Sequence, residues 1–209
     1  MNKPAGFQAR GMERRKRLIQ ACRDMLADHH VGQFGLAEVA ERAAVPKTSV
    51  YHFFPRIDDL LGALAVEVAQ DLIAWLDRPI AGPVMAWTDV VVALVDRGRT
   101  FYDQSRAALE IQLGPHTPVD IKNRDRQNDM SIGILLRNLV EQHFITPQLP
   151  DSAAVFFRAI EIADLMFMLS VREHDALTDF YATEAARAAN AYLALYLPPL
   201  LPRRDEAVA

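Results

Sequence analysis

Apolar residues recur along almost the whole chain with the three- to four-residue spacing of amphipathic helices. No segment shows the sustained alternation of apolar and polar residues, bounded by hairpin turns, that predicts β-strands. Proline and glycine pairs such as Gly114-Pro115 and Pro198-Pro199 separate the periodic stretches. The sequence therefore predicts an all-α fold.

We expect nine helices between these breaks. The approximate ranges of eight of them are 13–29, 36–43, 46–53, 57–77, 106–113, 117–143, 152–173 and 178–197. The remaining helix, the fifth in the chain, follows Gly82-Pro83 and ends near residue 104. Short to medium helices fill the first 55 residues, so we expect a compact trihelical unit there, joined through the fourth helix to a helical bundle. The tail after Leu201 is expected to be frayed.

The stretch from Phe34 to Leu61 predicts two short helices joined by the tight turn Ala44-Val45. Small residues precede the turn, where two helices must approach closely. The inward-facing apolar residues are Leu36, Val39 and Ala40 on the first helix and Val50 and Phe54 on the second. This arrangement predicts a helix-turn-helix, whose second helix enters the major groove of double-stranded DNA.

The second helix of this pair leaves a set of polar side chains facing outward. They are Lys47, Thr48, Ser49, Tyr51 and His52. These residue types supply hydrogen bonds to phosphates and to base edges. The alternatives are a solvated polar face and, for Tyr51, a packing role in the core.

Charge is distributed unevenly along the chain, whose net charge is -4. The first 60 residues carry ten lysines and arginines against seven acids, whereas the rest carries thirteen against twenty. A basic end on an acidic body is expected when only that end meets phosphate. The basic cluster Arg10, Arg14, Arg15, Lys16 and Arg17 fits either a DNA-backbone contact or a solvated helix start.

Two segments of the chain resemble the TetR family of bacterial regulators. AERAAVPKTSVYHFFPRIDDLL is similar to the family pattern A-x-x-A-G-V-(S/P)-K-G-(T/S)-hydrophobic-Y-x-(H/Y)-F-P-x-K-(E/D)-x-L, and RRKRLIQACRDMLADHHVGQFGL is similar to the family's first helix and following turn. The resemblance covers residues 13–64 and matches without gaps.

The resemblance implies a nine-helix, Ω-shaped homodimer. Residues 1–56 would form a helix-turn-helix DNA-binding domain, and residues 57–209 a helical ligand-binding and dimerisation domain. The middle helices would hold a small-molecule pocket, and an effector would tilt the fourth helix and separate the two DNA-binding heads. The partners implied are a palindromic operator and an effector, which we expect to have apolar surface.

Site residues follow from the same resemblance. Tyr51 matches a tyrosine that contacts phosphate, and Lys47 matches the lysine at the start of the recognition helix. Thr48, Ser49 and His52 occupy positions that touch bases or backbone. Arg14 and Arg17 lie in a segment close to the duplex.

Three departures from the family pattern matter, because each removes a possible phosphate hydrogen bond. Ile57 stands where the family has a lysine, and Arg56 is a possible replacement. Gly35 replaces a Ser or Thr that caps the second helix, and Phe53 replaces a His or Tyr.

Ligand-binding residues are predicted from polar and aromatic groups on apolar helical stripes. The set comprises Trp75, Arg97, Phe101 and Asn128. A buried polar group needs a partner, which a ligand could supply. Ordinary core packing, or a stripe edge that reaches water, explains the same residues.

The eighth and ninth helices are apolar around much of their circumference, which favours burial on more than one side. A four-helix homodimer interface accounts for this pattern, and a large monomeric core is the alternative. Two-fold DNA sites favour the dimer.

The sequence supports no other class of protein. We see no phosphate-binding loop, metal-ligand spacing or nucleophile motif, so we expect no enzyme activity, no metal and no cofactor. No apolar stretch is long enough to span a bilayer, and the single Cys22 suits a reducing compartment, so we expect a cytoplasmic protein without membrane contact.

Two functions remain open. The first is a repressor that a small molecule releases from its operator. The second is a DNA-bound protein of the same fold that acts through protein contacts, as in nucleoid-associated or division control, without an inducer.

Overall fold

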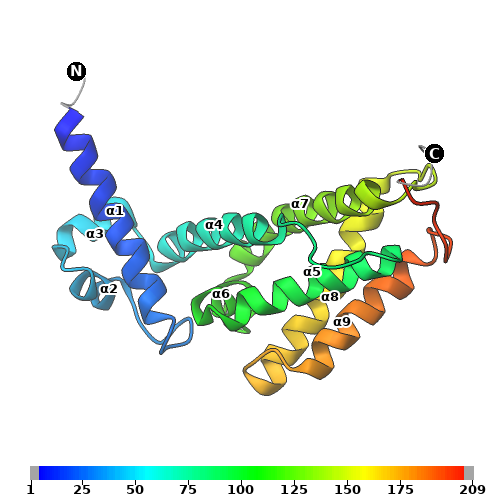
Figure 1. Cartoon of the computed structure of the whole chain (residues 1–209). Helices are drawn as coiled ribbons and strands as arrows, with labels where there is room; N and C mark the ends of the chain where they lie inside the picture. Colours follow the sequence, from blue (N-terminus) through cyan, green and yellow to red (C-terminus); the bar gives the residue numbers. More distant parts are fainter. Residues whose placement is uncertain (1–4, 205–209) are drawn as a thin grey trace. The chain divides into compact units, whose positions relative to one another are not determined.

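The computed structural model describes the backbone of residues 5–204 and the side chains of residues 10–123 and 128–204. Within these residues the regular elements are nine α-helices, so the expectation of an all-α, nine-helix fold is confirmed (Figure 1). The helices are α1 (Ala5–Met25), α2 (Leu36–Arg42), α3 (Lys47–Phe53), α4 (Ile57–Leu76), α5 (Trp87–Asp103), α6 (Arg106–Leu113), α7 (Val119–His143), α8 (Ser152–His174) and α9 (Asp179–Leu193).

Most helix ends lie close to the expected ones because local capping signals define them. Ser105 accepts a hydrogen bond from the backbone N–H of Ala108 at 3.2 Å and so starts α6 where expected. The main exception is α1, which begins eight residues earlier than expected because Gly11 lies inside the helix rather than before it. It also ends earlier, at Met25.

The chain forms two compact units. One contains Met1–Val68 and Ser105–Lys122, and the other contains Ala69–Gln104 and Asn123–Ala209. The expected domain boundary after residue 56 differs from this division in two ways. The division falls within α4, which is one continuous helix, and α6 belongs to the first unit because it packs against α1.

In the first unit, α1 packs against α2 and α2 packs against α3 around an apolar core. The fully buried side chains of this core include Leu18, Cys22, Leu26, Val39 and Val50. Burial raises the pKa of the Cys22 thiol to about 12, so this cysteine is a core residue.

The turn between α2 and α3 contains Ala44, whose φ is +49°. The backbone N–H of Val45 donates to the carbonyl of Ala40 at 3.0 Å and closes the turn. The guanidinium of Arg17 on α1 donates to the carbonyl oxygens of Ala43 and Ala44, the latter at 3.1 Å. Arg17 thus holds the carboxyl end of α2.

A buried ion cluster attaches α6 within the first unit. Glu110 is fully buried, and its Oε1 accepts hydrogen bonds from Arg106 at 2.8 Å and from Nδ1 of His30 at 3.0 Å. The hydroxyl of Thr117 donates to the backbone carbonyl of Glu110 at 2.8 Å. The cluster joins α6 to the loop that follows α1.

In the second unit, α9 packs against α8 and α5. The backbones of α7 and α8 touch at Gly133, where an added Cβ would lie 2.7 Å from backbone atoms of Phe157. Glycine is therefore required at this crossing. No helix of the described residues is long and apolar enough to cross a membrane.

The chain beyond Leu201 is attached to the second unit as far as Arg204, so the expectation of a frayed tail is wrong for residues 202–204. The carbonyl of Pro202 accepts a hydrogen bond from Ile145 at 2.8 Å, and the backbone N–H of Arg204 donates to His143 at 3.0 Å. The part of the expected tail from residue 205 to 209 lies outside the described residues.

Candidate nucleic-acid interface and internal cavity

The outward face of α3 carries the side chains that sequence patterning predicted there. Lys47, Thr48, Tyr51 and His52 are exposed, and Ser49 is half-buried. The opposite face is anchored by Val50, which is fully buried, and the chain after the helix is anchored by Phe54. The polar residues are therefore presented to solvent on a helix fixed by its apolar face.

Tyr51 is not a core residue, because its side chain is 54% exposed. Its neighbour His52 is also exposed, and its ring contacts Phe53 edge to face with centroids 5.6 Å apart. The packing alternative for Tyr51 is thus ruled out, and a phenol is available beside an imidazole on one helical surface.

At the start of α2, Gly35 has no side chain to cap the helix, and Glu38 takes over part of that role. The backbone N–H of Gly35 donates to Glu38 Oε2 at 3.0 Å, and backbone hydrogen bonds of this kind lower the pKa of the Glu38 carboxyl. The carboxylate complements the positive end of the helix. The start of α2 thus carries the Glu38 carboxylate and lacks the hydroxyl that the family pattern has at position 35.

The basic residues predicted around α3 differ in how they are held. Arg14 is exposed, whereas Arg17 uses part of its five-donor guanidinium on the α2–α3 turn. Arg15 lies over the ring of Phe54, 5.3 Å from its centroid. Arg56 forms a 2.6 Å ion pair with Asp58, which reduces its similarity to the lysine that the family has at position 57.

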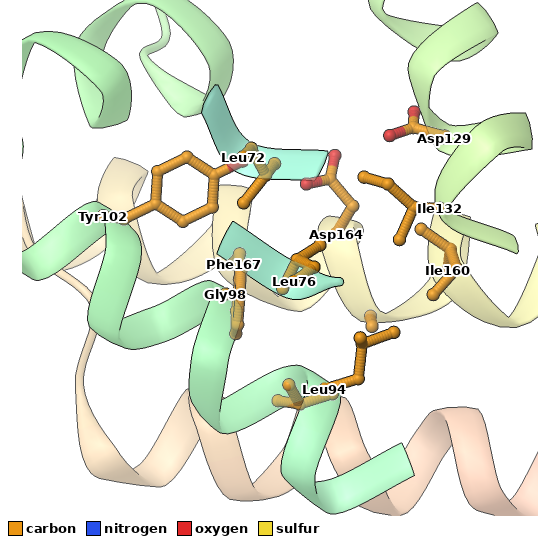
Figure 2. A pocket seen from close by; sticks show the side chains of 12 residues that line it. Leu72, Leu76, Leu94, Gly98, Tyr102, Asp129, Ile132, Ile160, Asp164 and Phe167 are labelled. Carbon is orange, nitrogen blue, oxygen red and sulfur yellow. The ribbon is translucent and has the colours of Figure 1, made fainter. Parts of the chain in front are cut away.

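The second unit contains a cavity of about 60 Å³ (Figure 2). Helices α4, α5, α7 and α8 contribute its walls. Its described lining residues are Leu72, Leu76, Leu94, Val95, Gly98, Tyr102, Asp129, Ile132, Ile160, Ala163, Asp164 and Phe167. It is an apolar space with two carboxylates.

The four predicted ligand residues are not among those that line this cavity. Arg97 instead donates to the carbonyls of Leu76, Arg78 and Pro79, at 2.9, 2.5 and 2.5 Å, and caps the carboxyl end of α4. The guanidinium of Arg97 is thus committed to backbone carbonyls.

Trp75 and Phe101 pack beside each other, with ring centroids 6.4 Å apart. The indole of Trp75 donates to the carbonyl of Arg97 at 3.1 Å, and Arg78 lies over its ring at 3.8 Å. Asn128 lies on α7 and is half-buried. Trp75 and Phe101 thus pack at the α4–α5 corner rather than on the cavity wall.

Sequence reasoning missed Asp129 and Asp164. Asp164 stands within the apolar run of α8, directly after Ala163 and three residues before Phe167. An acid in the middle of an apolar stripe was the available signal for a cavity carboxylate.

Residues 18–64 match the family described as "Bacterial regulatory proteins, tetR family". The HTH-type transcriptional repressor LfrR of Mycolicibacterium smegmatis is 30% identical over 122 residues, which cover 53% of this chain and 64% of that protein. The match therefore spans less than two thirds of the length of that relative.

Solved structures of regulators share the fold. A TetR-family transcriptional regulator from Streptomyces coelicolor superposes with a TM-score of 0.68 at 22% identity, covering 88% of this chain and 99% of that chain. A TetR transcriptional regulator from Rhodococcus sp. RHA1 gives a TM-score of 0.64 at 14% identity, covering 89% and 97%.

The matched segment contains the helix-turn-helix described above, with its exposed α3 face, and the fold likeness extends over nearly nine tenths of the chain. Residues 18–64 are thus similar to the tetR family of bacterial regulatory proteins, and the chain has the fold of the solved regulators.

Proposed function

We propose that this protein is a transcriptional repressor that binds a palindromic DNA operator and is released from it by a small molecule. The observation that carries the proposal is the exposed face of α3, where Lys47, Thr48, Tyr51 and His52 extend from a helix anchored by Val50. Lysine and tyrosine donate to phosphates, and histidine and threonine reach base edges. LfrR, the curated relative, is named as a repressor of this helix-turn-helix type.

The proposal requires two copies of the chain, because a palindrome offers two half-sites about 34–36 Å apart. We propose that α8 and α9 form the homodimer interface. Large apolar side chains are exposed on or directly after these helices: Leu165, Phe180, Leu195 and Tyr196. Burial of such side chains in a four-helix interface would remove them from water.

The cavity supports the proposed release from DNA by a small molecule. Leu72 and Leu76, near the carboxyl end of α4, form part of its wall, and α4 continues without a break from Ile57, just after the recognition helix. A ligand that enters the cavity contacts this wall and can displace it. If that displacement favours a spacing of the two heads that does not fit the operator, the ligand shifts the population away from DNA.

A DNA-bound protein that acts only through protein contacts would not need this cavity. Its apolar lining next to a helix that leads to the DNA-binding unit favours the ligand-released repressor.

Fluorescence anisotropy tests the proposed binding to operator DNA directly. The purified chain is titrated into a labelled duplex of the intergenic DNA upstream of its own gene, at two salt concentrations, beside a scrambled duplex. We expect sequence-selective binding whose affinity falls steeply with salt, because phosphate contacts release counterions. Genome-wide site selection supplies a second duplex from a distant operator.

The double variant Tyr51→Phe/His52→Ala removes the hydroxyl of Tyr51 and the imidazole of His52, both on the exposed face of α3, without changing its buried face. We expect it to lose selective binding while melting at the wild-type temperature. A matched control, Glu41→Gln, changes an exposed charge on α2 and should retain binding. Equal, weak binding of wild type and variant to both selected and scrambled DNA would overturn the proposal.

A further inference from the structure

The recognition helix α3 has little packing of its own to fix its direction. It spans seven residues, of which only Val50 is buried. A helix this short has few internal hydrogen bonds and can tilt about a single buried side chain. Hydrogen bonds to base edges weaken steeply when donor and acceptor are misaligned. Neighbouring elements must therefore hold the ends of α3 for it to read bases.

Before α3 begins, the chain passes through a strained turn. Ala44 has a φ of +49°, where a Cβ is unfavourable, and the family pattern has glycine there. Nη2 of Arg17 on α1 donates to the carbonyl oxygens of Ala43 and Ala44, the latter at 3.1 Å. One side chain thus holds two successive peptide planes of the turn, and these planes set the direction in which α3 starts.

Helix α1 also reaches the carboxyl end of α3. The guanidinium of Arg15 lies over the ring of Phe54, 5.3 Å from its centroid, and Phe54 is the buried residue that directly follows α3. At Gly11, an added Cβ would lie 4.0 Å from Cζ of Phe53, the last residue of the helix. Residues of α1 therefore contact the chain at both ends of the recognition helix, within one compact unit.

We infer that Arg17 is a positioning residue for the recognition helix, and that it determines the sequence selectivity of DNA binding rather than the general attraction to DNA. The inference rests on the proposed function, since it assigns a role within the binding of operator DNA. Arg17 acts through Ala44, because its hydrogen bonds hold the turn in the left-handed conformation from which α3 presents its outward side chains.

A positioning residue differs measurably from a phosphate contact and from a residue that only stabilises the fold. A phosphate contact strengthens binding to every duplex and contributes about one counterion to the salt dependence. A positioning residue affects only the base contacts, so it changes the affinity for the operator and not for scrambled DNA. A residue that only stabilises the fold would change the folded fraction and weaken binding to both duplexes by the same factor.

Fluorescence anisotropy of the wild-type chain and of Arg17→Ala separates these roles. The probes are the duplex that the wild-type chain selects from genomic DNA and a scrambled duplex of the same composition. We expect Arg17→Ala to bind the selected duplex about 10-fold more weakly, and to bind the scrambled duplex with the wild-type affinity and salt dependence. An equal change on both duplexes, including no change, or a salt slope lower by about one, would overturn the inference.

The substitution Ala44→Gly provides a matched rescue that restores no charge. Glycine adopts the left-handed conformation freely, so the turn no longer depends on a guanidinium to hold it. We expect the double variant Arg17→Ala/Ala44→Gly to regain most of the preference for the selected duplex that Arg17→Ala loses. Glycine cannot replace a phosphate contact, so a double variant as unselective as Arg17→Ala would contradict the inference. Circular dichroism at the assay temperature checks that each chain is folded.

Hydrogen exchange measures the positioning of α3 without DNA, so the two proposals fail separately. The amide hydrogens of residues 47–54 should exchange faster in Arg17→Ala than in wild type and slow again in the double variant. Those of α6, which belongs to the same unit, should exchange as in wild type. Unchanged exchange in α3 overturns the inference and leaves the repressor intact. Absence of selective binding by wild type overturns the repressor, whereas exchange still decides whether Arg17 holds α3.

Discussion

The guanidinium of Arg17 donates a hydrogen bond of 3.1 Å to the carbonyl oxygen of Ala44, the residue that reverses the chain between α2 and α3. Ala44 has a φ of +49°, in the left-handed region, where a Cβ costs about 1–2 kcal/mol. The family pattern has glycine at this position. The turn of this protein is therefore strained by one methyl group and held by a side chain from another helix.

Ala44→Gly should stabilise the protein. Removal of the Cβ relieves the left-handed strain, and the greater freedom of glycine in the unfolded chain offsets part of the gain, which leaves about 0.5–1 kcal/mol. Urea denaturation followed by circular dichroism measures the change. Ala43→Gly is the control: its φ is -74°, so the same substitution should destabilise by a similar amount. A loss of stability in Ala44→Gly would contradict the argument.

Alanine variants should show that Arg14 contacts DNA and that Arg17 stabilises the fold. Arg17→Ala removes hydrogen bonds to the α2–α3 turn and is expected to lower the unfolding free energy by about 1 kcal/mol. Arg14→Ala should leave the melting temperature unchanged and reduce the salt dependence of DNA binding by about one counterion. Thermal melts and anisotropy at several salt concentrations measure both. An Arg14→Ala variant with the wild-type salt slope would exclude Arg14 from the DNA contact.

The buried carboxylate of Glu110 should matter far more than an exposed acid of the same unit. Glu110→Ala leaves a void and removes the acceptor for Arg106 and His30, with an expected cost of about 2–3 kcal/mol. Glu67 is 43% exposed and lies 3.8 Å from Arg23, so Glu67→Ala should cost less than about 1 kcal/mol. Chemical denaturation of the two variants compares them, and equal costs would argue against a role for the cluster in attaching α6.

Gly98→Ala should stabilise the fold and weaken ligand binding at once. Alanine is favoured over glycine inside a helix by about 1 kcal/mol, and its Cβ would contact the ring of Phe167 at the ordinary distance of 3.5 Å. The methyl group would occupy part of the cavity. We expect a higher melting temperature together with a several-fold lower affinity for a small apolar aromatic probe, 1-methylnaphthalene, in calorimetry. Unchanged affinity would place the ligand elsewhere.

Cys22 should react with iodoacetamide only when the protein unfolds. Its side chain is fully buried, and its pKa of about 12 leaves almost no thiolate at pH 8. Because folding raises this pKa, the contribution to stability is present below the pKa of the unfolded thiol and is lost as the pH rises above about 9. Mass spectrometry of alkylated samples with and without urea checks the first point. Rapid alkylation of the native chain would contradict it.

Local signals predicted most of the helices well because a cap or breaker lies close to their ends. Ser105 and Gly114 bound α6 at the expected residues, and Val50 and Phe54 point inward as their spacing indicated. The exposed face of α3 follows from the same spacing, since a helix that buries one stripe must expose the other.

The cavity could not be predicted in the same way. Helical spacing shows that a residue lies on an apolar stripe, but it does not show which neighbouring helix covers it. Arg97 lies on such a stripe, yet its long side chain reaches the last carbonyls of α4 instead of the cavity. Asp164 lies on a stripe as well, and only the meeting of α8 with α4, α5 and α7 makes it a cavity residue.

Trp75, close to the carboxyl end of α4, is an intrinsic fluorescent probe of this part of the structure. The chain has two tryptophans, and Trp75 lies one residue before Leu76, which lines the cavity, with Arg78 stacked 3.8 Å above its ring. The other, Trp87, is buried and donates to the carbonyl of Pro198 at 3.0 Å, so Trp87→Phe removes the second emitter at the cost of that hydrogen bond. A Trp87→Phe chain would emit from Trp75 alone, so displacement of the α4 wall and loss of the stacked cation would register as a change in emission wavelength and yield, in real time and without any attached dye.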